Sequence, residues 1–379
     1  MTKFYHDFKL GVLGGGQLGR MLIQSCVNFN VHTSVMDPDS HAPCSGFSSE
    51  FRRGPIRDYE AVYEFGKSVD MLTIEIENVN VEALEKLEQE GLPVYPQARV
   101  IKLIQDKRTQ KQFYLDNDIP TADFVLVNNK EDILSKSDFL PAFNKLGKGG
   151  YDGGGVQRID TIADIDNAFD APGLLEKLVD YDKELSVIAA RNVIGEVEVF
   201  PAVEMVVHPE YNLVDYLVAP SNISQEIEQE AQDLAKKVIN SLDMVGILAV
   251  ELFLTKDGKL LVNEVAPRPH NSGHQTINAN YTSQYEQHLR SILGLPLGST
   301  EIKRPSAMVN LIGEEGYTGP AIYDGIEEIL KVKGVNVFLY GKMVTKPHRK
   351  MGHITIIDDD MDQLIEKVEF VKRTIKVIA

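Results

Sequence analysis

Residues 247–274 read ILAVELFLTKDGKLLVNEVAPRPHNSGH, which is two apolar, β-rich runs separated by Lys256-Asp257-Gly258-Lys259 and followed by a polar segment. Two such runs around Asp-Gly predict a β-hairpin. If Asp257 and Gly258 are the two loop residues of a type I′ turn, the register places Glu251 directly opposite Glu264. The segment therefore predicts a hairpin with two glutamates facing each other on neighbouring strands.

Two glutamates opposed amid apolar neighbours repel each other, so something must neutralise them. A hard divalent cation is the natural partner, because Mg²⁺ is typically held by one or two carboxylates together with substrate phosphates. Glu251 and Glu264 are accordingly predicted to be metal ligands beside a nucleotide. The alternative is that a bulge shifts the register and leaves one glutamate facing water.

The polar segment 263–274 brings carboxylate, guanidinium, amide and imidazole groups together directly after a strand, which is typical of a binding site. His270 and His274 have the spacing of two zinc ligands on one face of a helix. Pro269 and Gly273 argue against a regular helix, and no third zinc ligand is in view. Both histidines are therefore interpreted as polar residues that line a substrate pocket.

Composition narrows the class of protein. The chain has 379 residues, 43% hydrophobic and 25% charged, and a formal net charge of −17. This length allows two or three domains. The acidic balance argues against a general nucleic-acid or anionic-membrane binder, so an anionic substrate must meet a local cluster of basic residues. Only two cysteines, no apolar signal segment and no apolar run of about 20 residues predict a cytoplasmic protein that does not span a membrane.

The N-terminal region opens with an apolar strand at 9–13, a glycine turn at 14–20, a helix and a second strand at 31–36 that ends at Asp37. Strand, glycine turn, helix and strand are the opening of a doubly wound α/β domain. Further strand and helix patterns continue it to about residue 100. The predicted first domain is 1–100.

The glycine turn also fits a dinucleotide site. Gly14, Gly16 and Gly19 match G-x-G-x-x-G, and Asp37 follows at nearly the spacing of the acid that binds a ribose. An NAD-dependent oxidoreductase is therefore the alternative from another class of enzyme. It depends on this turn alone.

Residues 101–300 are predicted to form an α+β middle domain. A helical segment at 100–117 leads to strands that flank the glycine-rich sequence KLGKGGYDGGG at 145–155. Backbone N–H groups of such a hairpin can surround an anion. A single long strand is expected at 196–207 and a polar-faced helix at 224–242, before the hairpin completes the domain.

Residues 301–379 predict a small third domain with short strands and a terminal amphipathic helix. In this acidic chain, one turn-like region of it gathers basic residues that form a candidate phosphate clamp. They are Lys342, Lys346, His348, Arg349 and Lys350. The alternative is a solvated basic loop.

Five motifs, taken in order, resemble those of the N5-carboxyaminoimidazole ribonucleotide synthetase family, the ATP-grasp ligases of bacterial and fungal purine synthesis. The resemblance covers nearly the whole chain, to about His353. It implies a biotin-carboxylase-like N-terminal α/β domain, a central ATP-grasp region and a small C-terminal domain, usually in a homodimer. The motifs are GGGQLGRM at 14–21, EIENV at 75–79, QDK at 105–107, GYDG at 150–153 and NEVAPR at 263–268, which continues to His274.

The resemblance implies the carboxylation of 5-aminoimidazole ribonucleotide by bicarbonate with ATP, giving ADP, phosphate and the N5-carboxylated nucleotide. Carboxyphosphate is the expected intermediate, Mg²⁺ (or Mn²⁺) the expected cofactor, and biotin is not required. A formate-dependent glycinamide ribonucleotide transformylase is the nearest alternative, since its metal segment resembles PRPH at 267–270. The motifs around Tyr151 and Asn78 favour the carboxylating family.

Carried over position by position, the resemblance also implies roles for single residues. Lys107 and Lys145 would hold the ATP phosphates, Glu184 the ribose, and Glu251 and Glu264 the metal. The residues implied in ATP binding are Lys107, Lys145, Gly150, Tyr151, Asp152, Gly153, Gly154, Gly155, Val156, Glu176, Lys177, Leu178, Val179, Glu184, His208, Asn263 and Glu264.

The imidazole nucleotide would be bound at the other end of the site. The residues implied in its binding are Gln17, Leu18, Glu75, Asn78, Lys342, Arg349 and Lys350. Arg268 is expected to stabilise carboxyphosphate, while Asp152, beside Tyr151, orients the amine or accepts its proton. These three are the predicted catalytic residues.

Overall fold

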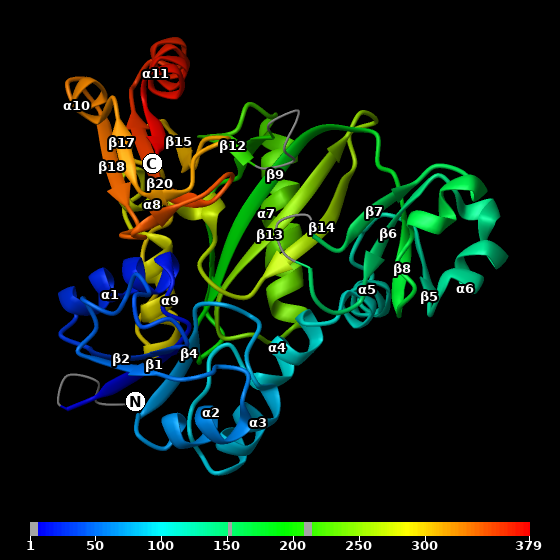
Figure 1. Cartoon of the computed structure of the whole chain (residues 1–379), viewed down its shortest axis with the longest axis horizontal. Helices are drawn as coiled ribbons and strands as arrows, with labels where there is room; N and C mark the ends of the chain where they lie inside the picture. Colours follow the sequence, from blue (N-terminus) through cyan, green and yellow to red (C-terminus); the bar gives the residue numbers. More distant parts are fainter. Residues whose placement is uncertain (1–6, 151–153, 208–213) are drawn as a thin grey trace.

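The computed structural model describes residues 7–150, 154–207 and 214–379. Its N-terminal part is built on a parallel sheet of order β3-β2-β1-β4 (Figure 1). Helices α2 and α3 pack together on one face, and α1 packs on the other. The elements are β1 (Lys9–Leu13), α1 (Gln17–Asn28), β2 (His32–Asp37), β3 (Glu50–Arg53), α2 (Tyr59–Gly66), β4 (Met71–Ile74), α3 (Val81–Gln89) and α4 (Ala98–Ile104).

A smaller antiparallel sheet of order β5-β8-β6-β7 forms a separate lobe, at the right of Figure 1. The glycine-rich sequence joins β6 to β7, which pair with Lys145 opposite Val156, as a hairpin requires. The elements are α5 (Lys107–Asp116), β5 (Phe124–Val127), α6 (Lys130–Ser135), β6 (Ala142–Leu146), β7 (Val156–Ile159) and β8 (Gly173–Lys177).

A nine-stranded antiparallel sheet of order β14-β13-β9-β11-β12-β15-β20-β18, with β10 paired to β9, forms the centre. Helix α7 covers one face, and α9 lies between the other face and the N-terminal part. The elements are β9 (Tyr181–Arg191), β10 (Val197–Val199), β11 (Val203–Val207), β12 (Val214–Ala219), α7 (Gln225–Ser241), β13 (Gly246–Thr255), β14 (Leu260–Ala266), α8 (Thr276–Ala279) and α9 (Gln284–Leu293).

The period of two along β13 explains which side chains reach the site. Leu248, Val250 and Leu252 are buried against α7. The alternate residues Ala249, Glu251 and Phe253 face the opposite side, because successive side chains of a strand point to opposite faces. A hydrophobic contact with α7 therefore fixes the face on which Glu251 emerges.

The C-terminal strands continue the central sheet, since β15 pairs with β12 and then with β20. Helix α11 packs over them and encloses a separate hydrophobic core. The elements are β15 (Ser306–Ile312), β16 (Gly319–Pro320), β17 (Ile322–Asp324), α10 (Ile326–Ile329), β18 (Val335–Leu339), β19 (Val344–Thr345), β20 (Lys350–Ile357), α11 (Met361–Thr374) and β21 (Lys376–Ile378).

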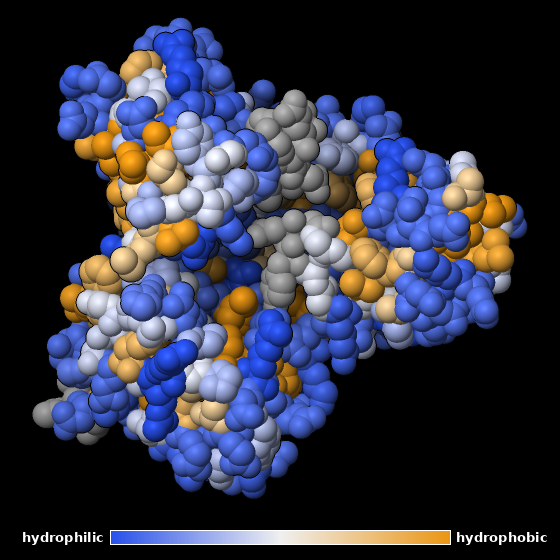
Figure 2. Space-filling model, in the orientation of Figure 1, coloured by the Kyte–Doolittle hydropathy of each residue, from blue (hydrophilic) through white to orange (hydrophobic). Residues whose placement is uncertain are grey.

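Figure 2 shows a mainly polar surface, with apolar side chains gathered at the tip of the small lobe and on part of the C-terminal region. No helix within the described ranges is long and apolar enough to cross a membrane.

Three local predictions are wrong. The helix expected at 100–117 is two helices, because Asp106 caps α5 by accepting a hydrogen bond from Arg108 N–H at 3.0 Å. The strand expected at 196–207 is interrupted between β10 and β11. The hairpin turn is not the two-residue type, since Thr255 N–H donates to Lys259 O at 2.9 Å and so encloses three residues.

The glycine turn before α1 is closely packed against Glu75, so a larger residue in the turn should destabilise the fold. A Cβ built on Gly16 would lie 2.3 Å from Glu75 Oε1, which also accepts a hydrogen bond from Leu18 N–H at 3.2 Å. Gly16→Ala must displace that buried carboxylate, so we expect a loss of about 1–3 kcal/mol in the free energy of unfolding, measured with urea. Gly46→Ala, where a Cβ would meet nothing within 4 Å, is the control. Equal stability of the two variants would contradict this packing.

Candidate active site

A cleft of about 490 Å³ opens between the central sheet, the small lobe and the N-terminal part. Most of the residues implied in nucleotide and metal binding lie in its wall. They are Lys107, Lys145, Gly150, Gly154, Gly155, Val156, Glu176, Lys177, Val179, Glu184, Glu251, Asn263 and Glu264, with Arg268 and Lys350.

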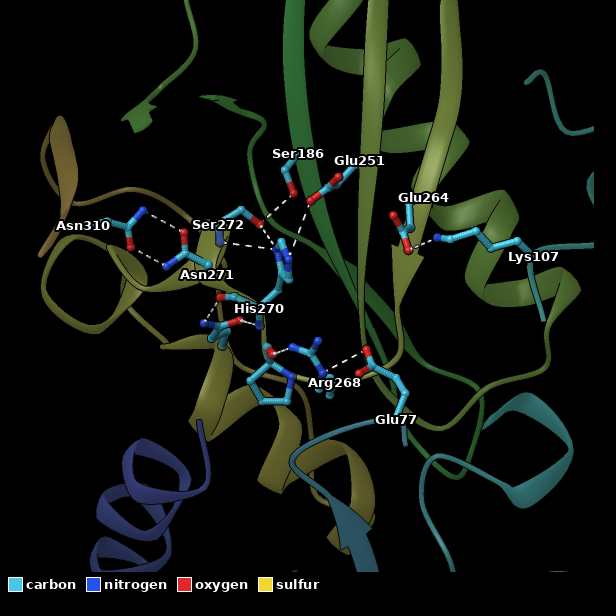
Figure 3. A network of polar contacts seen from close by, with 12 residues as sticks. Glu77, Lys107, Ser186, Glu251, Glu264, Arg268, His270, Asn271, Ser272 and Asn310 are labelled. Carbon is cyan, nitrogen blue, oxygen red and sulfur yellow. Dashed lines mark hydrogen bonds and ion pairs between the residues drawn. The ribbon is translucent and has the colours of Figure 1, made fainter. Parts of the chain in front are cut away.

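Glu251 and Glu264 are opposed across β13 and β14, as predicted, but two departures from the predicted register cancel. The three-residue turn pairs Leu252 with Val262, and a bulge at Asn263 then restores the pairing of Glu251 with Glu264. A bulge leaves one extra residue unpaired and re-aims side chains. It brings Asn263 and Glu264 together into the cleft wall, and Figure 3 shows the two carboxylates on adjacent strands.

The lysines predicted to bind phosphate are both held by carboxylates. Lys107 Nζ lies 2.5 Å from Glu264 Oε1, and Lys145 forms an ion pair with Glu176 (Figure 3 draws the first pair). Lys107 reaches the cleft because it is the first residue of α5, where its N–H donates to Gly147 O at 2.7 Å. An incoming anion would compete with these carboxylates and replace them as the partner of each lysine.

The two opposed glutamates differ in pKa. Burial raises the pKa of Glu251 from 4.5 to about 7, and the nearby carboxylates of Glu264 and Glu184 add to the rise. Burial acts in the same direction on Glu264, but the ion pair with Lys107 outweighs it and lowers the pKa. One of the pair is therefore fully ionised at neutral pH while the other is poised to lose its proton.

The polar segment after β14 holds Arg268 and His270 in fixed positions. Arg268 Nε lies 2.9 Å from Glu77 Oε1, and both side chains are largely buried. Ser272 N–H donates to His270 Nδ1 at 3.4 Å, so Nε2 is left to face Glu251 Oε1, 3.6 Å away (Figure 3). Burial, with the charges of Arg268 and Lys350, lowers the pKa of His270 to about 3, and the ring is neutral.

The glycine turn of the N-terminal part is occupied by the protein's own carboxylates. Gly15 N–H donates to Asp37 Oδ2 at 2.7 Å, and Leu18 N–H donates to Glu75. These are the positions at which a dinucleotide site would bind ribose and pyrophosphate. The expectation of an oxidoreductase thus loses the one feature that supported it, whereas the predicted neighbours Leu18 and Glu75 do meet.

Burial raises the pKa of Glu75 to about 7, and Arg268 and the N–H of Leu18 oppose that shift. Glu75 and Glu77 therefore connect the glycine turn to Arg268 at the cleft. Gln105 fixes this segment by donating from Nε2 to Glu77 O at 2.7 Å and to Val79 O at 3.0 Å.

The basic cluster of the C-terminal part is only partly directed at the cleft. Lys350 lines it, and Lys342 Nζ donates to Lys350 O at 2.7 Å, so these two are neighbours. Arg349 donates instead to Val344 O at 2.6 Å. Arg20 of α1 lies against Gly341, where an added Cβ would meet its guanidinium at 2.3 Å. The cluster thus borders the glycine turn.

Not every predicted residue is placed in the cleft wall. Tyr151, Asp152, Gly153 and His208 fall outside the described residues, so the structure does not test them. The cleft wall, as described, does not include Gln17, Leu18, Glu75, Asn78, Leu178, Lys342 or Arg349.

Sequence reasoning missed Glu77, the partner of Arg268, and Lys111, the second partner of Glu176. The position of Glu77 two residues after Glu75 was a usable signal. Lys111 gave none, because a lysine in a polar helix is ordinarily exposed. In the described part of the chain, no three His, Cys, Asp or Glu side chains are arranged to hold a metal ion by themselves.

Comparison with known proteins places these features in a family. Residues 8–105 match the ribonucleotide synthetase preATP-grasp domain, 112–285 the ATP-grasp domain, and 306–367 the phosphoribosylaminoimidazole carboxylase C-terminal domain. N5-carboxyaminoimidazole ribonucleotide synthase of Bacillus subtilis is 37% identical over 371 residues, covering 96% of this chain and 95% of that protein.

Solved structures agree. The Thermotoga maritima N5-carboxyaminoimidazole ribonucleotide synthetase is 40% identical, with a TM-score of 0.90 over 98% of this chain and 99% of that one. The Aspergillus clavatus synthase, solved with ADP and 5-aminoimidazole ribonucleotide, is 33% identical, with a TM-score of 0.89 over 98% and 99%.

The raised pKa of Glu251 predicts a pH-dependent stability. Between its ordinary value of 4.5 and about 7, the folded chain binds this proton more strongly than the unfolded chain, so stability falls as pH rises through that window. Glu251→Gln removes the effect. Above pH 7 we expect the variant to be more stable by on the order of 2 kcal/mol, in urea unfolding without nucleotide or metal. The exposed Glu230→Gln is the control, and parallel pH profiles for wild type and Glu251→Gln would refute the assignment.

Proposed function

The chain belongs to the family of N5-carboxyaminoimidazole ribonucleotide synthases, ATP-grasp ligases of purine biosynthesis, and on this premise we propose how its cleft works. The reaction is the ATP-dependent carboxylation of 5-aminoimidazole ribonucleotide by bicarbonate, with release of ADP and phosphate. The observation that carries the proposal is that the opposed pair Glu251 and Glu264 lies in one cleft with Lys107, Lys145 and Arg268.

ATP would lie between the small lobe and the central sheet. Lys107 and Lys145 bind its phosphates after exchanging their present carboxylate partners for phosphate oxygens. The glycines of the β6–β7 hairpin offer backbone N–H groups to the same phosphates. Lys177, Val179, Glu184 and Asn263 line this part of the cleft. Lys177 and Val179 would border the adenine, Glu184 the ribose, and Asn263 the nucleotide beside the bulge.

Two carboxylates fit Mg²⁺, which takes oxygen ligands from one or two carboxylates and completes its shell with phosphates and water. The raised pKa of Glu251 supports this fit. Burial and the nearby carboxylate of Glu264 make the ionised form of Glu251 unfavourable, and a bound cation would stabilise it. Glu251 and Glu264 would hold it, and the ion would supply charge neutralisation on the transferring phosphoryl group.

Bicarbonate would be activated at the inner end of the cleft. Attack of its oxygen on the γ-phosphoryl group gives carboxyphosphate and ADP. Arg268, held by Glu77, offers a fixed positive charge to this dianionic intermediate. The walls keep water away from the mixed anhydride until it releases CO₂ to the amine.

The imidazole nucleotide would be bound where the N-terminal and C-terminal parts meet. Gln17, Leu18, Glu75 and Asn78 lie on the first side, and Lys342, Arg349 and Lys350 supply cations for its phosphate on the other. The placement of Arg20 against Gly341 supports this, since it brings the two sides together. Asp152, next to Tyr151 in the sequence, orients the amine or accepts its proton. The family resemblance implies a homodimer, and the cysteine content and lack of an apolar signal segment predict a cytoplasmic location.

The first experiment is ADP release with ATP, Mg²⁺ and bicarbonate, with and without 5-aminoimidazole ribonucleotide. We expect release that depends on the imidazole nucleotide and stops when EDTA removes Mg²⁺. Formate with glycinamide ribonucleotide replaces bicarbonate and the imidazole nucleotide in the control. Release only in that control would move the assignment to a transformylase.

Arg268→Ala tests the stabilisation of carboxyphosphate. Loss of a preorganised charge should reduce turnover by about 2–4 kcal/mol of transition-state stabilisation. Arg304→Ala, which breaks an exposed ion pair with Asp359, is the matched control and should retain turnover. A wild-type rate for a folded Arg268→Ala protein would remove Arg268 from the mechanism.

A further inference from the structure

A buried triad of charges lies behind the phosphate-binding end of the cleft. Glu176 of β8 forms ion pairs with two lysines, Lys145 of β6 and Lys111 of α5, and Lys111 Nζ is 2.5 Å from Glu176 Oε2. The side chains of Lys111 and Glu176 are each only 3% exposed, whereas Lys145 reaches the cleft wall. Lys111 therefore contacts the ATP site only through other residues.

Lys111 also connects the triad to the strand that carries the metal carboxylate. Its Nζ donates to Thr121 Oγ1 at 2.5 Å, and Thr121 Oγ1 donates to Val262 O at 2.7 Å. Val262 directly precedes the bulge at Asn263, beyond which Glu264 faces the cleft. One buried ammonium group thus joins α5, β8 and β14, the three elements that carry Lys107, Glu176 and Glu264.

The charge balance of the triad explains why a second lysine is needed. Lys145 and Glu176 alone would form a neutral pair, which offers little attraction to a phosphate. Two lysines and one glutamate leave one net positive charge. Lys145 and Glu176 both line the cleft and Lys111 does not, so the extra positive charge is placed behind the pair that an incoming phosphate meets. A carboxylate buried with one partner missing is also strongly unfavourable, so without Lys111 the pairing of Glu176 with Lys145 would tighten.

We propose that Lys111 is a positioning residue for ATP: by neutralising Glu176 from behind, it leaves the charge of Lys145 available to the nucleotide phosphates and ties Lys145 to the strand of Glu264. The proposal rests on the proposed function for the identity of the nucleotide. Its test is nucleotide binding, which can be measured whether or not carboxylation is observed.

Lys111→Met keeps the length of the side chain and removes its charge. We expect the Kd for ADP, measured by calorimetry, and the KM for ATP to rise about tenfold or more. Both nucleotides lose the attraction of the net positive charge that the triad presents. The KM for 5-aminoimidazole ribonucleotide should stay within about twofold, because that nucleotide is assigned to the opposite end of the cleft. A purely structural role would lower the melting temperature and change both KM values together.

A second substitution separates charge from packing. In Lys111→Met with Glu176→Gln, only Lys145 remains charged, so the triad regains one net positive charge. Because Glu176 itself lines the cleft, the comparison is with Lys111→Met: we expect the double variant to bind ADP several-fold more tightly than the single variant does. The double variant buries no uncompensated carboxylate. If Lys111→Met fails to fold, ADP affinity can therefore still be measured in the double variant. Affinity of the double variant as weak as that of the single one, or failure of both to fold, would overturn the proposal.

Lys367→Met is the matched control. Lys367 of α11 forms a partly buried ion pair with Asp358, with side chains 20% and 21% exposed, outside the cleft. Its loss should lower stability and leave the KM for ATP unchanged. A rise in that KM equal to the one in Lys111→Met would show that the effect is not specific to the triad. Wild-type protein that binds ADP but shows no release dependent on the imidazole nucleotide would count against the proposed function alone.

Discussion

Two carboxylates, those of Glu251 and Glu264, face each other on neighbouring strands of the central sheet, and their mutual repulsion has to be compensated. Without ligands the chain does this in two ways. Lys107 neutralises Glu264, and burial raises the pKa of Glu251 to about 7, so that a proton occupies it for much of the time. A divalent cation would take over both functions. In the absence of ligands, Lys107 and the proton on Glu251 therefore do for the two carboxylates what a bound metal ion would do.

The same arrangement recurs around the cleft. Three cations assigned to ATP or to carboxyphosphate are already held by carboxylates: Lys107 by Glu264, Lys145 by Glu176 and Arg268 by Glu77. These pairs fix long, flexible side chains in place, so less conformational freedom is lost when a ligand binds. They also keep a local group of positive charges compatible with a chain of net charge −17. Affinity for a phosphate then depends on how easily each cation leaves its carboxylate partner. Lys111 matters because it also neutralises Glu176 and so weakens the hold of Glu176 on Lys145.

Sequence reasoning reached much of this but not always for the right reason. The opposition of Glu251 and Glu264 was predicted from a two-residue turn, whereas the structure has a three-residue turn and a compensating bulge at Asn263. Turn length and bulges depend on contacts with other strands, so a single hairpin sequence does not specify them. The family, its three regions and its reaction were recognised from ordered motifs and are confirmed by the comparisons. The roles of individual site residues stay predictions.

The sequence by itself determined the local features of the chain, because these depend on residues that are close together in the sequence. An apolar, β-rich run predicted the strand β13, and glycines marked the loops expected to approach a ligand. The Asp106 cap that starts α5 at Lys107 is also a local feature, although the sequence was interpreted as one helix over 100–117. Tertiary structure decided which charges meet. The pairing of Glu77 with Arg268, of Lys111 with Glu176, and of the glycine turn with Glu75 joins residues far apart in the chain. Nothing in the sequence around a lysine or a glutamate says whether it will be buried, because burial of a charge depends on a partner that only the folded chain can bring to it.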